Sequence, residues 1–221
     1  MPRFRLFHLP FVNKILDLIK MSTSPNKSRN VEKHFSPITL PQSPAGISSH
    51  KNLTGLPRVA RDIVADLYNN IQRWNDNHIR GANITKSIAH LKTNNIADYS
   101  KDLENLTSDL FDVVEKLSGI SEAFDFLCSQ MKSLVKLHKK TTTLFISMRN
   151  EQLADFVEAI TSAYKGELKV KKFVLENIAH AKNKNEVMFY AVCWAHQQKV
   201  NVETNVKLEA LLTETGHRRI M

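Results

Sequence analysis

The sequence predicts an all-α protein made of long helices, and three observations support this. All seven prolines lie at or before Pro57, so the following 164 residues contain nothing that breaks a helix interior. Apolar residues in that stretch recur at spacings of three and four, as on a helix with one buried face. The alternation typical of strands is essentially absent there. We therefore expect an elongated antiparallel helical bundle or coiled coil over residues 57–221.

Charge divides the 221-residue chain at the same point. Residues 1–56 carry eight Lys or Arg against two Asp or Glu, a net charge of +6, whereas residues 57–221 carry 23 against 20, a net charge of +3. Residues 22–52 are rich in Ser, Thr, Pro, Asn and Lys and poor in aromatic residues, so they contain too little apolar surface to offset the entropy lost on ordering. We predict a disordered basic tail over 1–56 and one helical interaction domain over 57–221.

Three Ser-Pro pairs in this tail are candidate phosphorylation sites, at Ser24, Ser36 and Ser43. Proline-directed kinases modify this pattern, and each phosphate would add about two negative charges to a basic segment. Ser-Pro pairs are also common in linkers that no kinase modifies. We predict that at least one of the three serines is phosphorylated.

Residues 1–20 differ from the rest of the tail because apolar residues alternate there with four basic residues and one acidic residue. This composition is typical of a mitochondrial transit peptide. It also suits a helix that lies on a membrane surface. A third interpretation is an upstream start, because Met21 opens a typical flexible leader, MSTSPNKS. We favour the third interpretation.

The first helical stretch begins at Pro57, whose missing N–H suits the first helical turn. One stripe at helical spacing follows it: Val59, Ile63, Leu67, Asn70, Ile71 and Trp74. We expect Gly81 to interrupt the helix, since glycine costs about 1 kcal/mol relative to alanine in a helix interior. A second piece then continues to about residues 93–95.

The clearest pattern in the chain is a heptad repeat that continues for five heptads without a slip. Its members, which we call the seam, are Tyr99, Leu103, Leu106, Leu110, Val113, Leu117, Ile120, Phe124, Leu127, Met131 and Leu134. A strict seven-residue repeat predicts a left-handed supercoil. A helix over residues 98–138 would be a rod of roughly 60 Å, so its seam must pack on other helices or on another protein.

Three further helices are expected, over residues 151–181, 186–198 and 203–215, with Gly216 as a cap after the last. The helix over 186–198 is apolar on several sides, so it is either central to the core or docked on a partner. Its Trp194, like Trp74, is expected in the core or at an interface, where tryptophan is enriched. Cys128, beside the seam, is expected to be a small buried residue.

Motifs that would indicate catalysis are missing from the sequence. It has no glycine-rich phosphate loop, no nucleophile elbow and no kinase signature. Cys193 and His196 are three residues apart and could supply two metal ligands, but a zinc site needs about four and no second pair is evident. Two cysteines rule out a disulfide framework, and no run of about 18 apolar residues could span a membrane. We expect no enzyme activity, cofactor, metal or membrane span.

Two other functions remain open at this point. Local lysine clusters could make the chain a basic helical nucleic-acid-binding protein, although they are more typical of solvated helix faces. The long heptad could also belong to a coiled-coil structural or membrane-tethering protein.

Three stretches resemble one known family. Near its end the chain reads Leu211-Leu212-Thr213-Glu214-Thr215-Gly216-His217-Arg218. The second stretch is Ile178-Ala179-His180, followed by Tyr190 and Trp194-Ala195-His196-Gln197. The third stretch is Ile71-Gln72-Arg73-Trp74, followed by Gly81, Ile88 and Leu91-Lys92. These are similar to the LLxETGHR, AH…Y…WxHQ and LKW…G…I…LK signatures of the cyclin-dependent kinase 2 interacting protein family. Residues 1–20 have no counterpart, and the family's HQP reads His196-Gln197-Gln198 here.

The resemblance implies a non-catalytic, chromatin-associated nuclear adaptor in DNA replication and checkpoint signalling. Its implied partners are cyclin-dependent kinase, Dbf4-dependent kinase, a checkpoint kinase complex, origin-recognition and helicase proteins, and subunits of an AAA+ ATPase assembly acting in replisome turnover and ribosome maturation. A homodimer or helical heterodimer is compatible with the seam. We predict partner contacts at Leu103, Leu106, Leu110, Val113, Leu117, Ile120, Phe124, Leu127, Trp194, His196, Leu211, Leu212, Gly216, His217 and Arg218.

Overall fold

The computed structural model describes residues 53–94, 100–138 and 143–217, and every regular element in these ranges is a helix. This confirms the predicted all-α fold class. The helices are α2 (Leu56–Asn94), α3 (Lys101–Leu137), α4 (Asn150–Ile178), α5 (Lys184–Ala195) and α6 (Val202–Glu214). Most of the predicted tail, with Ser24, Ser36 and Ser43, lies outside the described residues.

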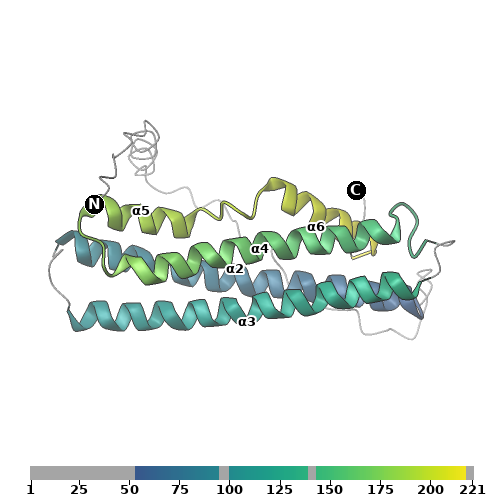
Figure 1. Ribbon diagram of the computed structural model, residues 1–221, viewed down its shortest axis with the longest axis horizontal. Helices are drawn as coiled ribbons and strands as arrows, with labels where there is room; N and C mark the ends of the chain where they lie inside the picture. Colours follow the sequence, from purple (N-terminus) through teal and green to yellow (C-terminus); the bar gives the residue numbers. More distant parts are fainter. Residues whose placement is uncertain (1–52, 95–99, 139–142, 218–221) are drawn as a thin grey trace, which may run out of the picture. The chain divides into compact units, whose positions relative to one another are not determined.

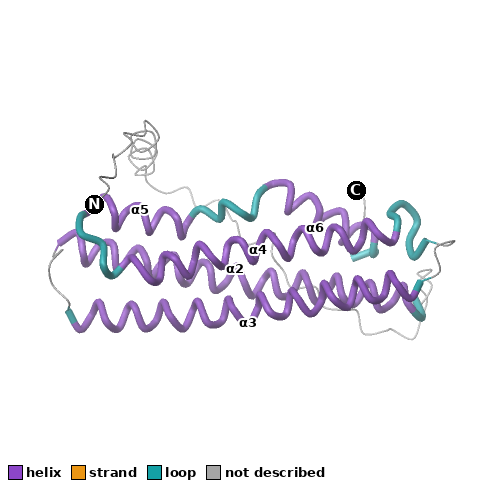
Figure 2. Tube along the Cα trace, viewed as in Figure 1, coloured by secondary structure: helices purple, strands orange, loops and turns teal. Residues whose placement is uncertain are grey.

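The three long helices lie side by side, and the two short ones follow each other along the same bundle (Figure 1). Helix α3 packs against both α2 and α4, while α5 and α6 each contact α2 and α4. Helices α5 and α6 therefore occupy together the position of a fourth bundle helix. Figure 2 shows that this fourth position is interrupted by the loop at residues 196–201.

Helix α2 is continuous through Gly81, which corrects the expected interruption there. The expectation used only the intrinsic helix propensity of glycine, which is a small term. Packing of the apolar face supplies most of the stability of a helix in a protein and overrides it. Gly81 is itself buried, so its lack of a side chain serves the packing described below.

The seam faces the interior of the bundle along α3, while its first member, Tyr99, lies outside the described residues. From Leu103 to Leu134 every seam position is buried except Leu106, which is half-buried. Val114, Ser121 and Cys128 each follow a seam position and are buried too. This wider buried face lets α3 contact two neighbours at once, as bundle helices do. The left-handed supercoil that the repeat indicates stays a prediction.

An aromatic cluster joins the three long helices in the core. Tyr164 of α4 lies with its ring centroid 5.1 Å from that of Trp74 of α2 and 5.1 Å from that of Phe124 of α3. The Trp74–Tyr164 pair is edge-to-face, a favourable arrangement for aromatic rings. Burial raises the pKa of the Tyr164 hydroxyl, so the ring stays neutral.

Polar caps set where the later helices begin. Asn183 and Asn201 precede α5 and α6, and each side chain accepts a hydrogen bond from the backbone N–H three residues later. Ser100 caps α3 in the same way. The last three helices begin and end within three residues of the predicted bounds. No helix in the described ranges is long and apolar enough to cross a lipid bilayer.

Truncating the seam should unfold the protein more easily than truncating the outer face of the same helix. The Leu117 side chain is fully buried, so Leu117→Ala should lower the free energy of unfolding by about 2–5 kcal/mol. Phe126 is 63% exposed, and Phe126→Ala should change it by only about 0.5 kcal/mol. Urea unfolding followed by circular dichroism measures both, and equal losses would contradict the buried seam.

Candidate functional site

The indole of Trp194, at the end of α5, packs directly on the backbone of α2 at Gly81. Trp194 has no exposed surface, and a Cβ atom at position 81 would lie only 2.0 Å from its Cζ2 atom. The indole Nε1–H donates to the His78 carbonyl oxygen at 3.1 Å. Gly81 is therefore a notch that admits a large ring, because any side chain there would collide with it.

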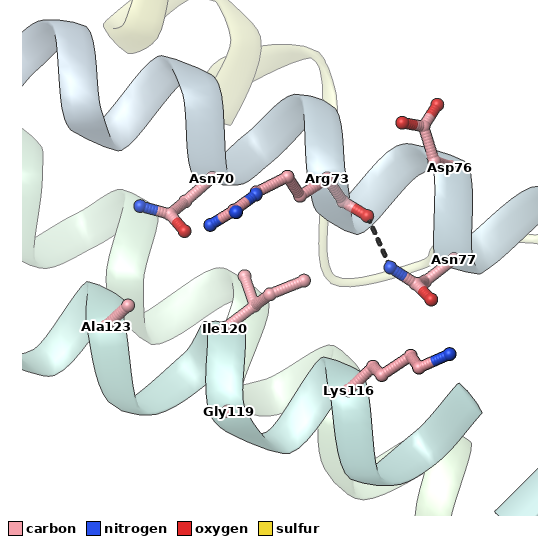
Figure 3. Close-up of a pocket in the computed structure, with 8 residues that line it drawn as sticks. All are labelled: Asn70, Arg73, Asp76, Asn77, Lys116, Gly119, Ile120 and Ala123. Carbon is pink, nitrogen blue, oxygen red and sulfur yellow. Dashed lines mark hydrogen bonds between the residues drawn. The ribbon is translucent and has the colours of Figure 1, made fainter. Parts of the chain in front are cut away.

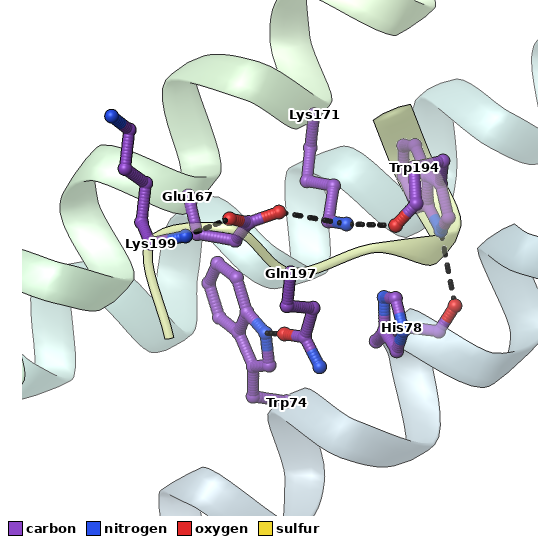
Figure 4. A network of polar contacts seen from close by, with 7 residues as sticks. All are labelled: Trp74, His78, Glu167, Lys171, Trp194, Gln197 and Lys199. Atoms are coloured by element: carbon purple, nitrogen blue, oxygen red, sulfur yellow. Dashed lines mark hydrogen bonds and ion pairs between the residues drawn. The ribbon is translucent and has the colours of Figure 1, made fainter. Parts of the chain in front are cut away.

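The second tryptophan is tied to the loop that follows α5. The Trp74 Nε1–H donates to Oε1 of Gln197 at 2.9 Å, as Figure 4 shows. Trp74 is also fully buried. Each indole N–H thus has a hydrogen-bond acceptor, as a buried indole requires. Both bonds link α2 to the C-terminal part of the chain.

A buried ion pair on α4 binds both the end of α5 and the loop that leads to α6. Glu167 and Lys171 have no exposed side-chain surface, and the Lys171 ammonium lies 3.0 Å from Oε1 of Glu167. Lys171 donates to the Trp194 carbonyl oxygen at 2.5 Å, while Oε2 of Glu167 accepts the Lys199 backbone N–H at 3.1 Å (Figure 4). One residue pair therefore binds the chain just before and just after the bend. We call this whole set the Trp194 junction; its members are Trp74, His78, Gly81, Glu167, Lys171, Trp194, Gln197 and Lys199.

Burial controls the charges in the junction. Burial lowers the pKa of Lys171, and the neighbouring Glu167 carboxylate opposes that shift. Burial, with the Lys171 charge beside it, lowers the pKa of His78 to about 4, so this imidazole is neutral at pH 7. The Lys171 ammonium also lies 4.8 Å from the centroid of the Trp194 ring, within range of a cation–π contact. The buried Lys171 and Glu167 charges thus neutralise each other, as buried ions require.

A second buried lysine, Lys92, binds a backbone carbonyl at the C-terminal end of α4. Lys92 of α2 is 3% exposed, and its ammonium donates to the Ala179 carbonyl oxygen at 2.5 Å. Carbonyl groups in the last turn of a helix lack partners within the helix, and they carry partial negative charge. Lys92 and Lys171 therefore each supply a cation where a helix ends.

The C-terminal signature LLxETGHR forms a complete helix cap. Gly216 has φ +73°, its N–H bonds to the Thr213 carbonyl, and the His217 N–H bonds to the Leu212 carbonyl. These are the two hydrogen bonds of a Schellman motif, so Gly216 ends α6 as predicted. Leu211 and Leu212 are fully buried in the main core.

Two further signature residues connect this cap to other parts of the bundle. The Glu214 carboxylate accepts hydrogen bonds from the Ser147 N–H and hydroxyl and from the Met148 N–H. Burial opposes its ionisation, but these bonds together outweigh burial and lower the pKa of Glu214. The ring of His217 lies with Nε2 2.9 Å from the Arg61 carbonyl oxygen, which can only accept, so Nε2 carries the proton.

Most of the predicted partner-binding residues are therefore occupied inside the chain. The seam residues from Leu103 to Leu127 are buried except for half-buried Leu106, and Trp194, Leu211 and Leu212 are fully buried. His196 and Gly216 are exposed, and Arg218 lies outside the described residues. A partner could reach the seam only if the bundle opened. Partner contact at the seam stays a prediction. Of the two alternatives for the seam, other helices or another protein, the structure shows packing on the chain's own helices.

Two charged members of the junction were not identified from the sequence, although a signal was present. The buried stripe of α4 runs through Val157, Ile160, Tyr164, Val174 and Ile178. Continuing its spacing of three and four places Glu167 and Lys171 on the same stripe. Charged residues in register with a buried stripe indicate an internal pair.

The described residues gather no cluster of metal ligands. Cys193 is half-buried and His196 exposed, and no group of three or more His, Cys, Asp or Glu side chains comes together in the described part of the chain. A shallow hollow of about 420 Å³ lies between α2 and α3, over Gly119 and Ile120, with Arg73 and Lys116 at its edges (Figure 3). A larger open groove lies between the start of α3 and the end of α4.

The fold and the junction together define an all-α protein whose motif residues hold its own helices together. No family model matches the chain. The chain is 26% identical over 192 residues to the mouse (Mus musculus) protein named Cyclin-dependent kinase 2-interacting protein, covering 74% of this chain and 91% of the relative. The Bos taurus protein of that name is 26% identical over 73% of the chain and 90% of its own length, and the Xenopus laevis one 24% over 81% and 99%.

These similarities confirm the family resemblance stated from the motifs. The chain is similar to the cyclin-dependent kinase 2-interacting proteins at 24–26% identity over 73–81% of its length. These relatives are named as interacting proteins and not as enzymes.

Filling the notch at position 81 should destabilise the fold, whereas the same change at Gly119 should not. Gly81→Ala places a methyl group against the Trp194 ring and should cost about 1–3 kcal/mol or more. Gly119 lies in open space within α3, so Gly119→Ala should stabilise the protein by up to about 1 kcal/mol. Urea unfolding of both variants measures the difference, and a neutral Gly81→Ala would rule out the notch.

Stability should fall with acid in a way that depends on His78. Its pKa is about 4 in the folded protein and 6.5 when unfolded, so the unfolded state binds more protons between these values. The stabilisation is complete above about pH 6.5 and is lost as the pH falls toward 4, by on the order of 1–3 kcal/mol once partial exposure is allowed for. His217, whose pKa burial also lowers, acts in the same direction.

Urea midpoints at about pH 7.5 and 4.5 test this dependence. His78→Gln should reduce the loss on acidification relative to the unchanged protein. His90→Gln, at an exposed position of the same helix, serves as the control and should leave the loss unchanged. An identical acid loss in the His78 and His90 variants would contradict the assignment.

Proposed function

We propose that this chain is a non-catalytic adaptor that binds a cyclin-dependent kinase. The observation that carries the proposal is the similarity along about three quarters of the chain to proteins named for binding cyclin-dependent kinase 2. The relatives align over 91% and 99% of their own length, so the similarity is not confined to one short motif. The buried polar residues of the Trp194 junction stabilise the bundle itself and form no catalytic arrangement, which suits a protein that acts by binding.

The finer parts of the proposal follow from the family resemblance. The adaptor would link cyclin-dependent, Dbf4-dependent and checkpoint kinases to DNA replication and genome maintenance in the nucleus, on chromatin. It would also serve as a subunit of an AAA+ ATPase assembly acting in replisome turnover and ribosome maturation. The Ser-Pro pairs of the tail are supporting features, because a bound proline-directed kinase would have substrates in the same chain.

The structure directs attention to the outside of the bundle for the partner contacts. Because the seam is packed by the chain's own helices, a partner that binds the folded protein must use outer side chains. The large apolar residues exposed in the described ranges are Val59, Ile79, Phe111, Phe126, Leu137, Ile146, Phe173, Phe189, Val202 and Val206. Exposed aromatic residues are frequent anchors of protein interfaces.

Affinity purification with mass spectrometry from replicating cells tests the proposal. The tagged full chain should recover a cyclin-dependent kinase, with the ATPase subunits as the finer expectation. A variant carrying Leu110→Asp and Leu117→Asp should lose these partners, because two charges in the core prevent folding. Recovery of no kinase by the folded chain, or equal recovery by both chains, would reject the adaptor.

A further inference from the structure

Three aromatic side chains form a half-exposed cluster between the end of α4 and the outer side of α5. The ring centroids of Phe173 and Tyr190 are 5.9 Å apart, and those of Phe189 and Tyr190 are 5.6 Å apart. Phe173 is 48% exposed and Phe189 is 55% exposed. We call these three residues the α4–α5 aromatic face. The half-exposed rings of Phe173 and Phe189, on adjacent helices, form an apolar surface of the kind that another molecule often covers.

The rest of α5 extends this apolar surface. Only Val187 and Trp194 of the helix are buried, although its sequence is apolar on every side. Val192 is half-buried and follows Phe189 by three residues, which places it on the same side of the helix, whereas Cys193 packs partly against the main core. The sequence left open whether α5 is central to the core or docked on a partner. The structure shows it at the edge of the bundle, with one side packed and the other side apolar and uncovered.

The surroundings of this face carry more basic than acidic residues, although Glu176 lies one turn after Phe173 and Glu186 one turn before Phe189. Lys169 lies one turn before Phe173 and Lys172 next to it, while Lys182 and Lys184 lie at the start of α5. All four are exposed, and none forms an ion pair with another described residue. Residues 167–199 carry six Lys against three Glu, a net charge of +3, whereas α3 carries four Lys against seven Asp or Glu, a net charge of −3. The α4–α5 region is therefore basic where α3 is acidic, and α2 likewise carries six Lys or Arg against three Asp, a net charge of +3.

We propose that the α4–α5 aromatic face binds an acidic amphipathic helix of a partner protein. This inference rests on the proposed adaptor function and adds the surface and the chemistry of the partner. Apolar residues of the partner helix would cover Phe173 and Phe189, and its flanking Asp or Glu residues would meet the unpaired lysines. Such helices dock through apolar side chains at helical spacing, and charge complementarity selects the partner.

A nucleic acid fits this face less well. Single-stranded nucleic acids use aromatic rings as stacking platforms, which requires a free ring face. Here Tyr190 meets both phenylalanines edge to face, so the three rings pack against one another. A second copy is also disfavoured: its acidic α3, with exposed Phe111 and Phe126, has suitable chemistry, but joining different faces would give open chains of molecules.

Fluorescence anisotropy with the full chain tests the proposal. The probe is a labelled synthetic helix of about 18 residues, with Leu at spacings of three and four and Glu at the flanking positions. Its counterpart has Lys at every Glu position. We expect the Glu peptide to bind at least about tenfold more tightly than the Lys peptide, and to weaken between about 50 and 300 mM NaCl. Equal binding of the two peptides, or no binding of the Glu peptide, would overturn the proposal.

Matched variants locate the binding surface. Phe173→Ala with Phe189→Ala should weaken the Glu peptide at least about tenfold, whereas Phe111→Ala with Phe126→Ala on α3 should leave its affinity unchanged. All four positions are about half or more exposed, so both variants should keep the unfolding midpoint of the parent. The reverse pattern would reject this face, as would tighter binding of an oligo-dT or oligo-U strand, or concentration-dependent self-association abolished by the α3 changes.

The same variants separate this inference from the adaptor proposal. If the kinase is recovered from cells equally by the parent and by the Phe173/Phe189 variant, the adaptor stands and the surface assignment fails. If the peptide result holds but the folded chain recovers no kinase, the surface stands and the kinase-binding function fails.

Discussion

The contact between Trp194 and Gly81 is the constraint on which the rest of the structure depends. A fully buried indole can lie against the backbone of α2 only where a residue has no side chain, so this contact sets the position of α5 along α2. The Trp194 carbonyl then receives the Lys171 ammonium, and Lys171 is held by Glu167, which also receives the N–H of Lys199 beyond the bend. The loop at 196–201 is therefore bound to α4 near its start and near its end. Helix α6 can then follow α5 along α2 and α4.

This arrangement gives the family signatures a physical role. Trp74 and Gly81 belong to one motif and Trp194 and Gln197 to another, more than 100 residues later, yet they meet in one buried junction. The terminal motif forms a helix cap that also binds the 146–148 segment and α2. Residues that look like a recognition signature thus act first on the fold of the chain itself. The proposed recognition of other proteins then uses the outer face, where Phe173, Phe189 and the unpaired lysines lie.

Internal polar contacts that stabilise the bundle and outer surfaces of opposite charge together suit an adaptor. The buried Glu167–Lys171 pair and both tryptophan N–H groups find their partners within the bundle. The acidic α3 and the basic end of the α4–α5 region are then two surfaces with different preferences. A single small bundle can in this way select two partners by charge, since opposite charges guide association and like charges prevent it.

The sequence by itself determined the helical class, the helix bounds to within a few residues except at Gly81, and the side of α3 that faces inward. These properties depend on local spacing, on proline and on caps, and each can be read within one or two turns. Only the tertiary structure decided that Gly81 receives a ring, that Glu167 and Lys171 are paired in the core, and that the seam is covered by the chain's own helices. Those outcomes depend on contacts between helices that are distant in the sequence. Periodicity shows which side of a helix is buried, but it does not show which other helix packs against that side.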